Sequence, residues 1–349
     1  MNDLQCLSAS SSAASSADQF QSRSMQFKRI SLSWVALHPR PKGVIQFVGG
    51  AFYGTRPTWH YRYFLSALFE AGYTIIALPF RFTFHHWSVA LDLLEEHYRV
   101  RQAILNSLLH ESSRSSDYAF YANAAHYTWV GHSLGCKYVI LLEILNDGWE
   151  KFSDQAAEVG LEKAQLDTIH SHLMRVAQVR DRLNEKMQNA DRLGGSIDSE
   201  QPSIYNQSAI LIAPVIADLA AAIPLRSLQQ GCELMGLKVV PTVEQTYNLI
   251  AHSQSFNLLQ VLQFQQDCVA KPTCDRLVPG LKSPMSKAIA TAAIVGKHLE
   301  PVGLQIGSYV ADFNPLDKFI APLQSRQLEA IVLKMLTALQ QNPVLQQSR

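Results

Sequence analysis

Short apolar runs alternate with amphipathic segments along the first half of the chain, and this alternation constrains the fold more than any other feature. The apolar runs, which are expected to be strands, lie at residues 30–38, 44–48, 74–78 and 127–130, and the helical segments at 61–70, 89–109 and 135–145. Strands that alternate with helices form a mostly parallel sheet with helices on both faces. The sequence therefore predicts the α/β class.

A long charged segment, residues 147–203, precedes the remaining strands. Its apolar side chains recur at mostly three- and four-residue spacing, which predicts an amphipathic helix or a helical pair ending near Gly194 and Gly195: Leu166, Ile169, Leu173, Val176, Leu183 and Met187. Three interpretations remain open for it: a helix packed on the sheet, a cap over an active site, or a dimer surface. Further strands are expected at 209–212, 257–264 and 289–295, with a terminal helix at 325–339.

The N-terminal residues 1–24 are rich in serine and alanine and lack the apolar core of a secretory signal. Asp3 and Asp18 argue against a transit peptide, so the segment is interpreted as a disordered leader or as residues that precede a true start at Met25. Residues 25–349 are assigned to one domain. The most apolar stretch, 209–225, is interrupted by proline and too short to span a bilayer, which predicts a soluble protein.

Composition argues against several classes of partner. The 30 basic and 29 acidic residues leave a net charge of +1, so no nucleic acid is expected. Five scattered cysteines favour reduced thiols in a cytosol-like compartment. Cys268 and Cys274 lack a second cysteine pair or paired histidines at ligand spacing, so we predict no metal and no cofactor.

The segment Gly131-His132-Ser133-Leu134-Gly135 matches the pattern G-x-S-x-G. A five-residue pattern with three fixed positions recurs by chance. This match, however, lies between an apolar strand and an apolar helix, as the motif requires. There a tight turn lifts the serine hydroxyl above the sheet, and the flanking glycines avoid collisions. The context predicts Ser133 as a nucleophile.

A serine hydroxyl needs a base, and the base needs an orienting acid. His298 directly follows the last predicted strand, from which it can reach across the sheet edge to Ser133. The acid is expected after the penultimate strand, where Asp267 is our choice and Asp275, beyond a loop from Cys268 to Cys274, is the alternative.

Backbone N–H groups that stabilise an oxyanion are expected at two places. The N–H of Leu134 starts the helix after the nucleophile, and Gly50 and Ala51 follow the strand at 44–48. The glycine pair does not fit a nucleotide loop. G-x-G-x-x-G would need glycine in place of Ala51, and a phosphate loop would need Lys-Ser or Lys-Thr in place of Thr55-Arg56.

With these motifs the chain resembles an α/β-hydrolase-like family of cyanobacteria and plastid-bearing organisms, known as domain of unknown function 1350. The resemblance rests on residues 43–52 (GVIQFVGGAF), 72–80 (GYTIIALPF) and 131–137 (GHSLGCK), and more loosely on 296–301 (GKHLEP). It implies an α/β-hydrolase-like fold and a cytoplasmic location of the cyanobacterial type or, alternatively, a plastid one. Within that fold we assign the charged segment at 147–203 as a helical cap insertion. The resemblance implies no substrate.

Two functions follow from these expectations. The first is a serine hydrolase that cleaves a small-molecule ester or thioester through an acyl-enzyme, with residues 214–225 lining a pocket for a lipid-like acyl group. The second is a non-catalytic member of the fold that binds a small ligand or a protein partner. A transferase or haloperoxidase reaction on the same three residues is not separable by sequence, because a fold does not fix a reaction.

Overall fold

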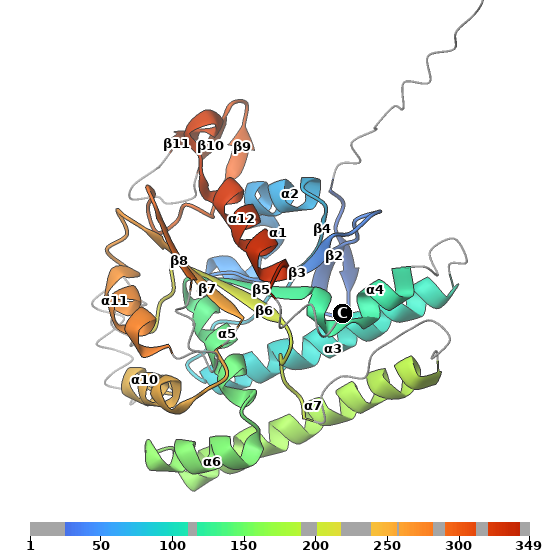
Figure 1. Ribbon diagram of the computed structural model, residues 1–349, viewed down its shortest axis with the longest axis vertical. Helices are drawn as coiled ribbons and strands as arrows, with labels where there is room; N and C mark the ends of the chain where they lie inside the picture. Colours follow the sequence, from blue (N-terminus) through green and yellow to red (C-terminus); the bar gives the residue numbers. More distant parts are fainter. Residues whose placement is uncertain are drawn as a thin grey trace, which may run out of the picture.

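The computed structural model describes residues 25–110, 117–189, 201–217, 239–256, 258–281, 290–311 and 320–342. Eight strands form one sheet in the order β1-β2-β4-β3-β5-β6-β7-β8 (Figure 1). They are β1 Lys28–Ile30, β2 Ser33–Ala36, β3 Gly43–Val48, β4 Tyr73–Ala77, β5 Tyr127–His132, β6 Ser208–Ile212, β7 Leu259–Phe264 and β8 Ala290–Ile294. A small separate sheet contains β9 Leu304–Ile306, β10 Tyr309–Ala311 and β11 Ile320–Pro322.

The pairing of the strands places a reversal of the strand order beside β3. All pairs from β4 to β8 across the sheet are parallel, and only β1 and β2 run antiparallel to their neighbours. β3 lies between β4 and β5, so the strand order reverses between β3 and β5. Open α/β sheets bind ligands at the carboxyl ends of the strands at such a reversal.

Helices cover both faces of the sheet, as Figure 1 shows, with α2 and α12 above it and α3 and α5 below it. The helices are α1 Pro57–His60, α2 Arg62–Glu70, α3 His86–His110, α4 Tyr118–Ala122, α5 Leu134–Leu145, α6 Trp149–Glu158, α7 Lys163–Asn189, α10 Val243–His252, α11 Lys271–Gly280 and α12 Leu328–Gln340. None of the described helices combines the length and apolar character needed to span a bilayer.

The core consists of two apolar layers, one on each face of the sheet. On β3, Val44 and Val48 join the layer formed with α3 and α5, while Ile45 and Phe47 join the layer formed with α2 and α12. Alternate residues of a strand point to opposite faces, so a strand buried on both sides is mostly apolar, and Gln46 is the buried polar exception in β3. This architecture confirms the predicted α/β-hydrolase-like fold.

The single strand predicted at residues 30–38 is wrong, because the chain turns at Ser31 and Leu32 between β1 and β2. Ser31 adopts φ 55°, which its neighbours must hold in place. The buried carboxylate of Glu96 on α3 accepts hydrogen bonds from Ser31 Oγ (2.8 Å), Leu32 N (2.8 Å) and Ser33 Oγ (2.7 Å). A carboxylate more than sixty residues away thus fixes a turn that local alternation does not reveal.

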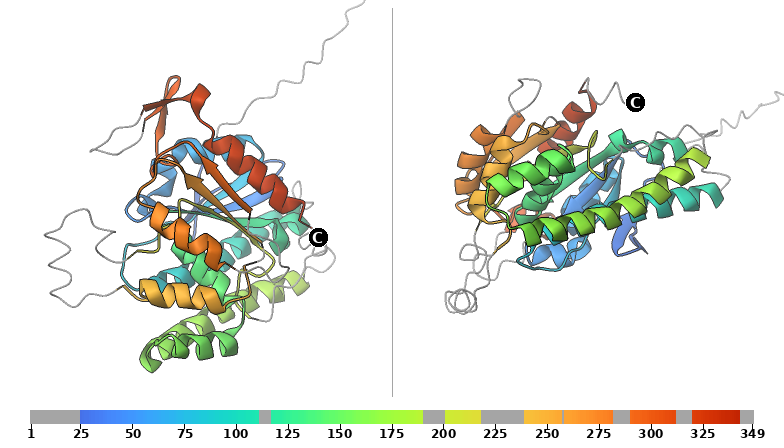
Figure 2. Two further views of the ribbon diagram at one scale, coloured as in Figure 1. Left: turned by 60° about the vertical axis from the view of Figure 1, so that its left-hand side comes forward. Right: turned by 90° about the horizontal axis from the view of Figure 1, so that it is seen from below.

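The insertion forms a helical pair, α6 and α7, outside α3 and α5. Seen from below in Figure 2, α7 runs along α3, and its buried side chains Ile169, Val176 and Leu183 join the same apolar cluster as α3. These contacts fit the interpretation as packed helices, and none of them supports a cap. The leader at 1–24 and the predicted end of the insertion at Gly194 and Gly195 lie outside the described residues.

Candidate functional site

Ser133 lies in the turn between β5 and α5, with φ 55° and ψ −122°. This conformation is strained for a residue that has a side chain. Two backbone hydrogen bonds hold it: Ser133 N donates to Ile212 O (3.0 Å), and Ser133 O accepts from Val215 N (3.2 Å). The end of β6 therefore supports the turn from the neighbouring position in the sheet.

The two glycines of the motif are needed because the backbone is close on both sides. A Cβ atom at Gly131 would lie 2.9 Å from the backbone of Cys136, and one at Gly135 would lie 2.3 Å from Val48 O. The second contact joins the start of α5 to the end of β3. The strand-to-helix turn predicted from the sequence is present, with the glycines in the expected role.

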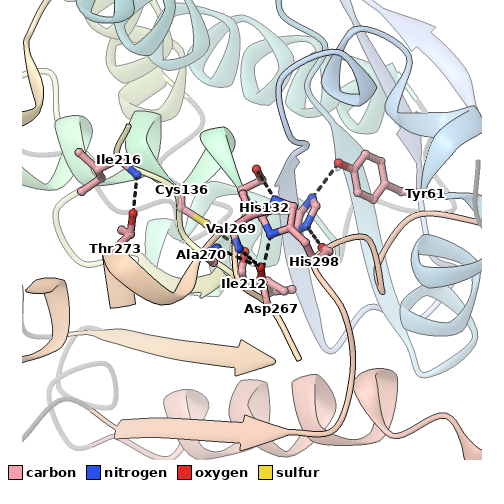
Figure 3. Close-up of polar contacts among 11 residues, drawn as sticks. Tyr61, His132, Cys136, Ile212, Ile216, Asp267, Val269, Ala270, Thr273 and His298 are labelled. Atoms are coloured by element: carbon pink, nitrogen blue, oxygen red, sulfur yellow. Dashed lines mark hydrogen bonds and ion pairs between the residues drawn. The ribbon is translucent and has the colours of Figure 1, made fainter. Parts of the chain in front are cut away.

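The structure brings three of the predicted residues together, and Figure 3 labels two of them, Asp267 and His298. His298, which follows β8, places Nε2 2.9 Å from Ser133 Oγ and Nδ1 2.8 Å from Asp267 Oδ2. Asp267 follows β7, and its second oxygen accepts hydrogen bonds from Val269 N and Ala270 N, both at 2.9 Å. The segments that follow the parallel strands β5, β7 and β8 thus meet at one edge of the sheet.

Asp275, the alternative acid, does not reach His298. Its exposed carboxylate pairs with Lys271 Nζ (2.9 Å), four residues earlier on α11. The segment from Cys268 to Cys274, which we expected to be a loop, instead enters the first turn of α11. The amides that bind Asp267 belong to this entry into the helix.

The environment of Asp267 determines the tautomer of His298. Burial raises the pKa of Asp267, but the hydrogen bond and charge of His298 and the two amides outweigh it, so the pKa lies below its ordinary value. An ionised carboxylate only accepts, so Nδ1 of His298 carries the hydrogen. In the neutral ring Nε2 then accepts the hydroxyl hydrogen of Ser133.

A second histidine, His132, for which we predicted no role, connects the parts of the site through hydrogen bonds. His132 Nε2 donates to the backbone oxygen of His298 (2.9 Å), and its Nδ1 therefore accepts from Tyr61 Oη (2.9 Å). Tyr61 Oη in turn accepts from Gly50 N (2.7 Å). Burial, with the charge of His298 as a smaller cause, lowers the pKa of His132 to about 3, so this ring is neutral.

The same chain of bonds corrects one predicted role. The N–H of Gly50 is directed to Tyr61, so it is not the oxyanion donor that we predicted. Gly50 instead brings the β3 loop close to the nucleophile, since a Cβ there would lie 3.1 Å from Ser133 Cβ. The N–H of Leu134, at the first position of α5, and that of Ala51 remain as candidate donors.

No ion or cofactor is implied at this site by its side chains, which are a hydroxyl, an imidazole and a carboxylate joined to each other. Among the described residues, the group whose atoms are spaced to hold a metal ion is Asp92, Glu95 and His172. These residues belong to α3 and α7, and not to the segments that carry Ser133, Asp267 and His298.

Comparisons with known proteins found the following similarities. The carboxylesterase Cest-2923 of Lactobacillus plantarum WCFS1 matches at 13% identity and a TM-score of 0.45, covering 90% of this chain and 96% of that one. An esterase/lipase from an uncultured bacterium matches at 12% identity and a TM-score of 0.41, covering 92% and 86%. No curated protein sequence matches. The model of a family described as "Protein of unknown function (DUF1350)" matches residues 26–153, which confirms over that range the family resemblance expected from the sequence.

Proposed function

We propose that the protein is a serine hydrolase that cleaves an ester or thioester through an acyl-enzyme. The observation that carries the proposal is the continuous pair of hydrogen bonds from Ser133 Oγ to His298 Nε2 and from His298 Nδ1 to Asp267 Oδ2. A hydroxyl, an imidazole and a buried carboxylate in this order are the parts that activate a serine nucleophile. The strained turn places Ser133 directly after β5, beside the reversal of strand order at which such sheets bind ligands.

In the first step Ser133 Oγ forms a bond to the carbonyl carbon of the substrate while His298 Nε2 takes the hydroxyl proton. The carbonyl oxygen becomes an oxyanion, which the N–H groups of Leu134 and Ala51 stabilise. As the tetrahedral intermediate collapses, the bond from carbon to the leaving oxygen or sulfur breaks. His298 passes its proton to that atom, and the acyl group stays on Ser133.

In the second step water replaces the leaving group. His298 Nε2 takes a proton from water as its oxygen attacks the acyl carbon, and then returns a proton to Ser133 Oγ as the acid leaves. Asp267 keeps its negative charge throughout and stabilises the imidazolium that forms twice. Neutral His132 exchanges no proton; with Tyr61 it holds the backbone of His298 and the β3 loop at a fixed separation.

Aromatic side chains in the segments after β3 and β4 support an apolar acyl group. Phe52, directly after Ala51, is 54% exposed and stacks on Phe82, with ring centroids 5.2 Å apart. Phe82 packs edge-on against Phe84 in the segment after β4. Aromatic walls with few polar groups are typical of sites for apolar ligands. Of the predicted acyl pocket at 214–225, residues 218–225 lie outside the described residues.

The proposal is tested by labelling purified full-length protein with a fluorophosphonate and measuring intact mass. Wild type is expected to gain one phosphonyl group, with fluoride as the leaving group, while Ser133→Ala gains none and His298→Ala reacts far more slowly. Ser153→Ala, a serine on α6, serves as the matched control and is expected to react like wild type.

Folded wild type that resists labelling, or a label found on another residue, would contradict the proposal. The non-catalytic, ligand-binding interpretation would then take its place. Where labelling succeeds, a series of p-nitrophenyl esters with increasing acyl length tests the apolar substrate: kcat/KM is expected to rise with chain length, and a Phe52→Ser substitution is expected to flatten that rise.

A further inference from the structure

We propose that Asp92, Glu95 and His172 form a binding site for a divalent transition-metal ion of the Zn²⁺ type, which joins α7 to α3. The site is independent of the proposed hydrolase activity. It would fix the helical insertion on the body of the domain.

The positions of the three side chains follow from the packing of two long helices. Asp92 and Glu95 are three residues apart on α3 and so share one face of that helix. His172 comes from α7, which lies along α3 (Figures 1 and 2). His172 Nε2 lies 3.2 Å from Asp92 Oδ1 and 3.9 Å from Glu95 Oε2, and the ligand atoms all lie within 4.8 Å of one another.

The separations of 3.2 and 3.9 Å from His172 Nε2 to the two carboxylates suit a common ion. Zn²⁺ binds imidazole nitrogen and carboxylate oxygen at about 2.0–2.2 Å in a tetrahedral arrangement, which places two ligand atoms about 3–4 Å apart. One nitrogen and two oxygens leave a fourth position for water. Ca²⁺ and Mg²⁺ prefer all-oxygen sites, so the imidazole selects for a transition metal.

The nitrogen of His172 supplies the second, independent argument. The side chain of His172 is only 7% exposed, yet among the described residues Nε2 has no partner in hydrogen-bond geometry, although it lies close to both carboxylates. Buried polar atoms are rarely left without a partner, and one that lacks a partner weakens the fold. A metal ion between the ring and the two carboxylates would satisfy this nitrogen.

The surroundings of the cluster also suit an ion. Arg99 Nε donates to Glu95 Oε1 (3.0 Å), so the other oxygen of Glu95 is the one that faces His172. Such a partner orients a carboxylate ligand from outside. The side chain of Asp92 is 71% exposed and borders a cavity of about 640 Å³. The lining of this cavity also contains the oppositely charged residues Asp167 and Arg175. An ion can therefore reach the cluster from solvent and keep a water ligand.

The test uses full-length protein freed of metal by EDTA and then titrated with ZnCl₂ by calorimetry. One Zn²⁺ per chain is expected to bind, and a concentration about 100-fold above Kd is expected to raise Tm by about 3 °C or more. His172→Gln and Asp92→Asn are each expected to abolish the shift. The matched controls His170→Gln and Asp154→Asn, exposed residues of α7 and α6, are expected to bind and shift like wild type.

A separate variant keeps the test decisive if these substitutions disturb folding. His172→Cys replaces the imidazole with a thiolate ligand, and addition of Co²⁺ is then expected to produce a thiolate charge-transfer band that wild type and His170→Cys lack. Wild type that binds no Zn²⁺, or His172→Gln that binds it as tightly as wild type, would overturn the proposal. The cluster would then be a histidine–carboxylate ion pair only.

Discussion

Two aspartate–histidine pairs in this molecule have the same residue types and opposite exposure. In Asp267–His298 the carboxylate is buried and 2.8 Å from the ring, and the ring is open on its other side to Ser133. In Asp92–His172 the histidine is buried and the carboxylate is open to solvent, at 3.2 Å and without hydrogen-bond geometry. The first pair directs a ring nitrogen to a hydroxyl, and the second directs one to a place where an ion fits.

The surroundings of the carboxylate determine what each aspartate–histidine pair can do. Asp267 accepts hydrogen bonds from two amides as well as from His298, so it stays ionised and holds one tautomer of the ring. Asp92 accepts no hydrogen bond from a backbone amide of the described residues, and its exposed carboxylate can change its contacts in water. A buried, fully bonded carboxylate orients an imidazole, whereas an exposed one remains available to a cation.

The largest effect is expected from Asp267→Asn. The amide can present a donor to His298 Nδ1, which would favour the wrong tautomer and leave a hydrogen on Nε2 facing Ser133. We expect phosphonylation of Ser133 to slow by about 1,000- to 10,000-fold, as for removal of an orienting aspartate in this type of site. The rate is measured by stopping the labelling reaction at successive times and determining the intact mass of the protein.

Asp275→Asn is the control for this substitution, because it removes a carboxylate eight residues away that pairs only with exposed Lys271. Its rate is expected to stay within about twofold of wild type, since exposed pairs contribute little. Equal slowing of both variants would remove the distinction drawn for Asp267 and reopen the choice of acid.

Much of this arrangement could be predicted because it depends on the order of elements along the chain. Parallel strands all end at one edge of the sheet, so a residue directly after a strand is placed there by topology. That argument led to Asp267 after β7 and His298 after β8, while the G-x-S-x-G motif indicated Ser133 after β5. The structure brings all three within hydrogen-bond distance. Their catalytic roles remain predictions.

What could not be predicted depends on contacts between residues far apart in sequence. Tyr61 was expected only as the start of a helix, yet its hydroxyl lies between Gly50 N and His132 Nδ1. No local pattern signals such a contact. The turn at Ser31 was missed for the same reason, since it depends on the Glu96 carboxylate. For His132 a signal did exist, because it lies next to Ser133 in the motif.

Tyr61→Phe tests whether the hydrogen bonds around the Asp267–His298 pair matter as much as the pair itself. It leaves the buried Gly50 N–H and His132 Nδ1 without their partner, which is expected to lower the free energy of unfolding by about 1–3 kcal/mol. Because the β3 loop carries Ala51, we also expect a 10- to 100-fold slower reaction with the fluorophosphonate, roughly the range of a misplaced oxyanion donor.

Tyr63→Phe is the matched control, because Tyr63 lies two residues later in α2 and is half-buried. Urea denaturation and labelling of the two variants are compared side by side. If Tyr61→Phe has the same stability and labelling rate as Tyr63→Phe, then the chain of hydrogen bonds from Gly50 to His298 has no part in positioning the site.

A comparison that affects stability alone concerns Glu143, a buried carboxyl group that lacks the partners of Asp267. It accepts one hydrogen bond, from Asn146 Nδ2 (2.9 Å), and its Oε1 has no partner among the described residues. Burial, only partly offset by Asn146, raises the pKa of Glu143 to about 8. At neutral pH this group is therefore expected to be protonated, whereas Asp267 is ionised.

The sign of the pH dependence follows from this difference. Below the ordinary pKa of 4.5 the folded and unfolded chains both hold the Glu143 proton, but between 4.5 and about 8 only the folded chain holds it. The free energy of unfolding is therefore expected to fall as pH rises through that window, by up to about 1.4 kcal/mol per pH unit. Glu143→Gln cannot titrate, so its stability relative to wild type is expected to rise from pH 5 to pH 8 in urea denaturation. Parallel pH profiles of the two proteins would mean that Glu143 is ionised in its buried position, and the contrast with Asp267 would fail.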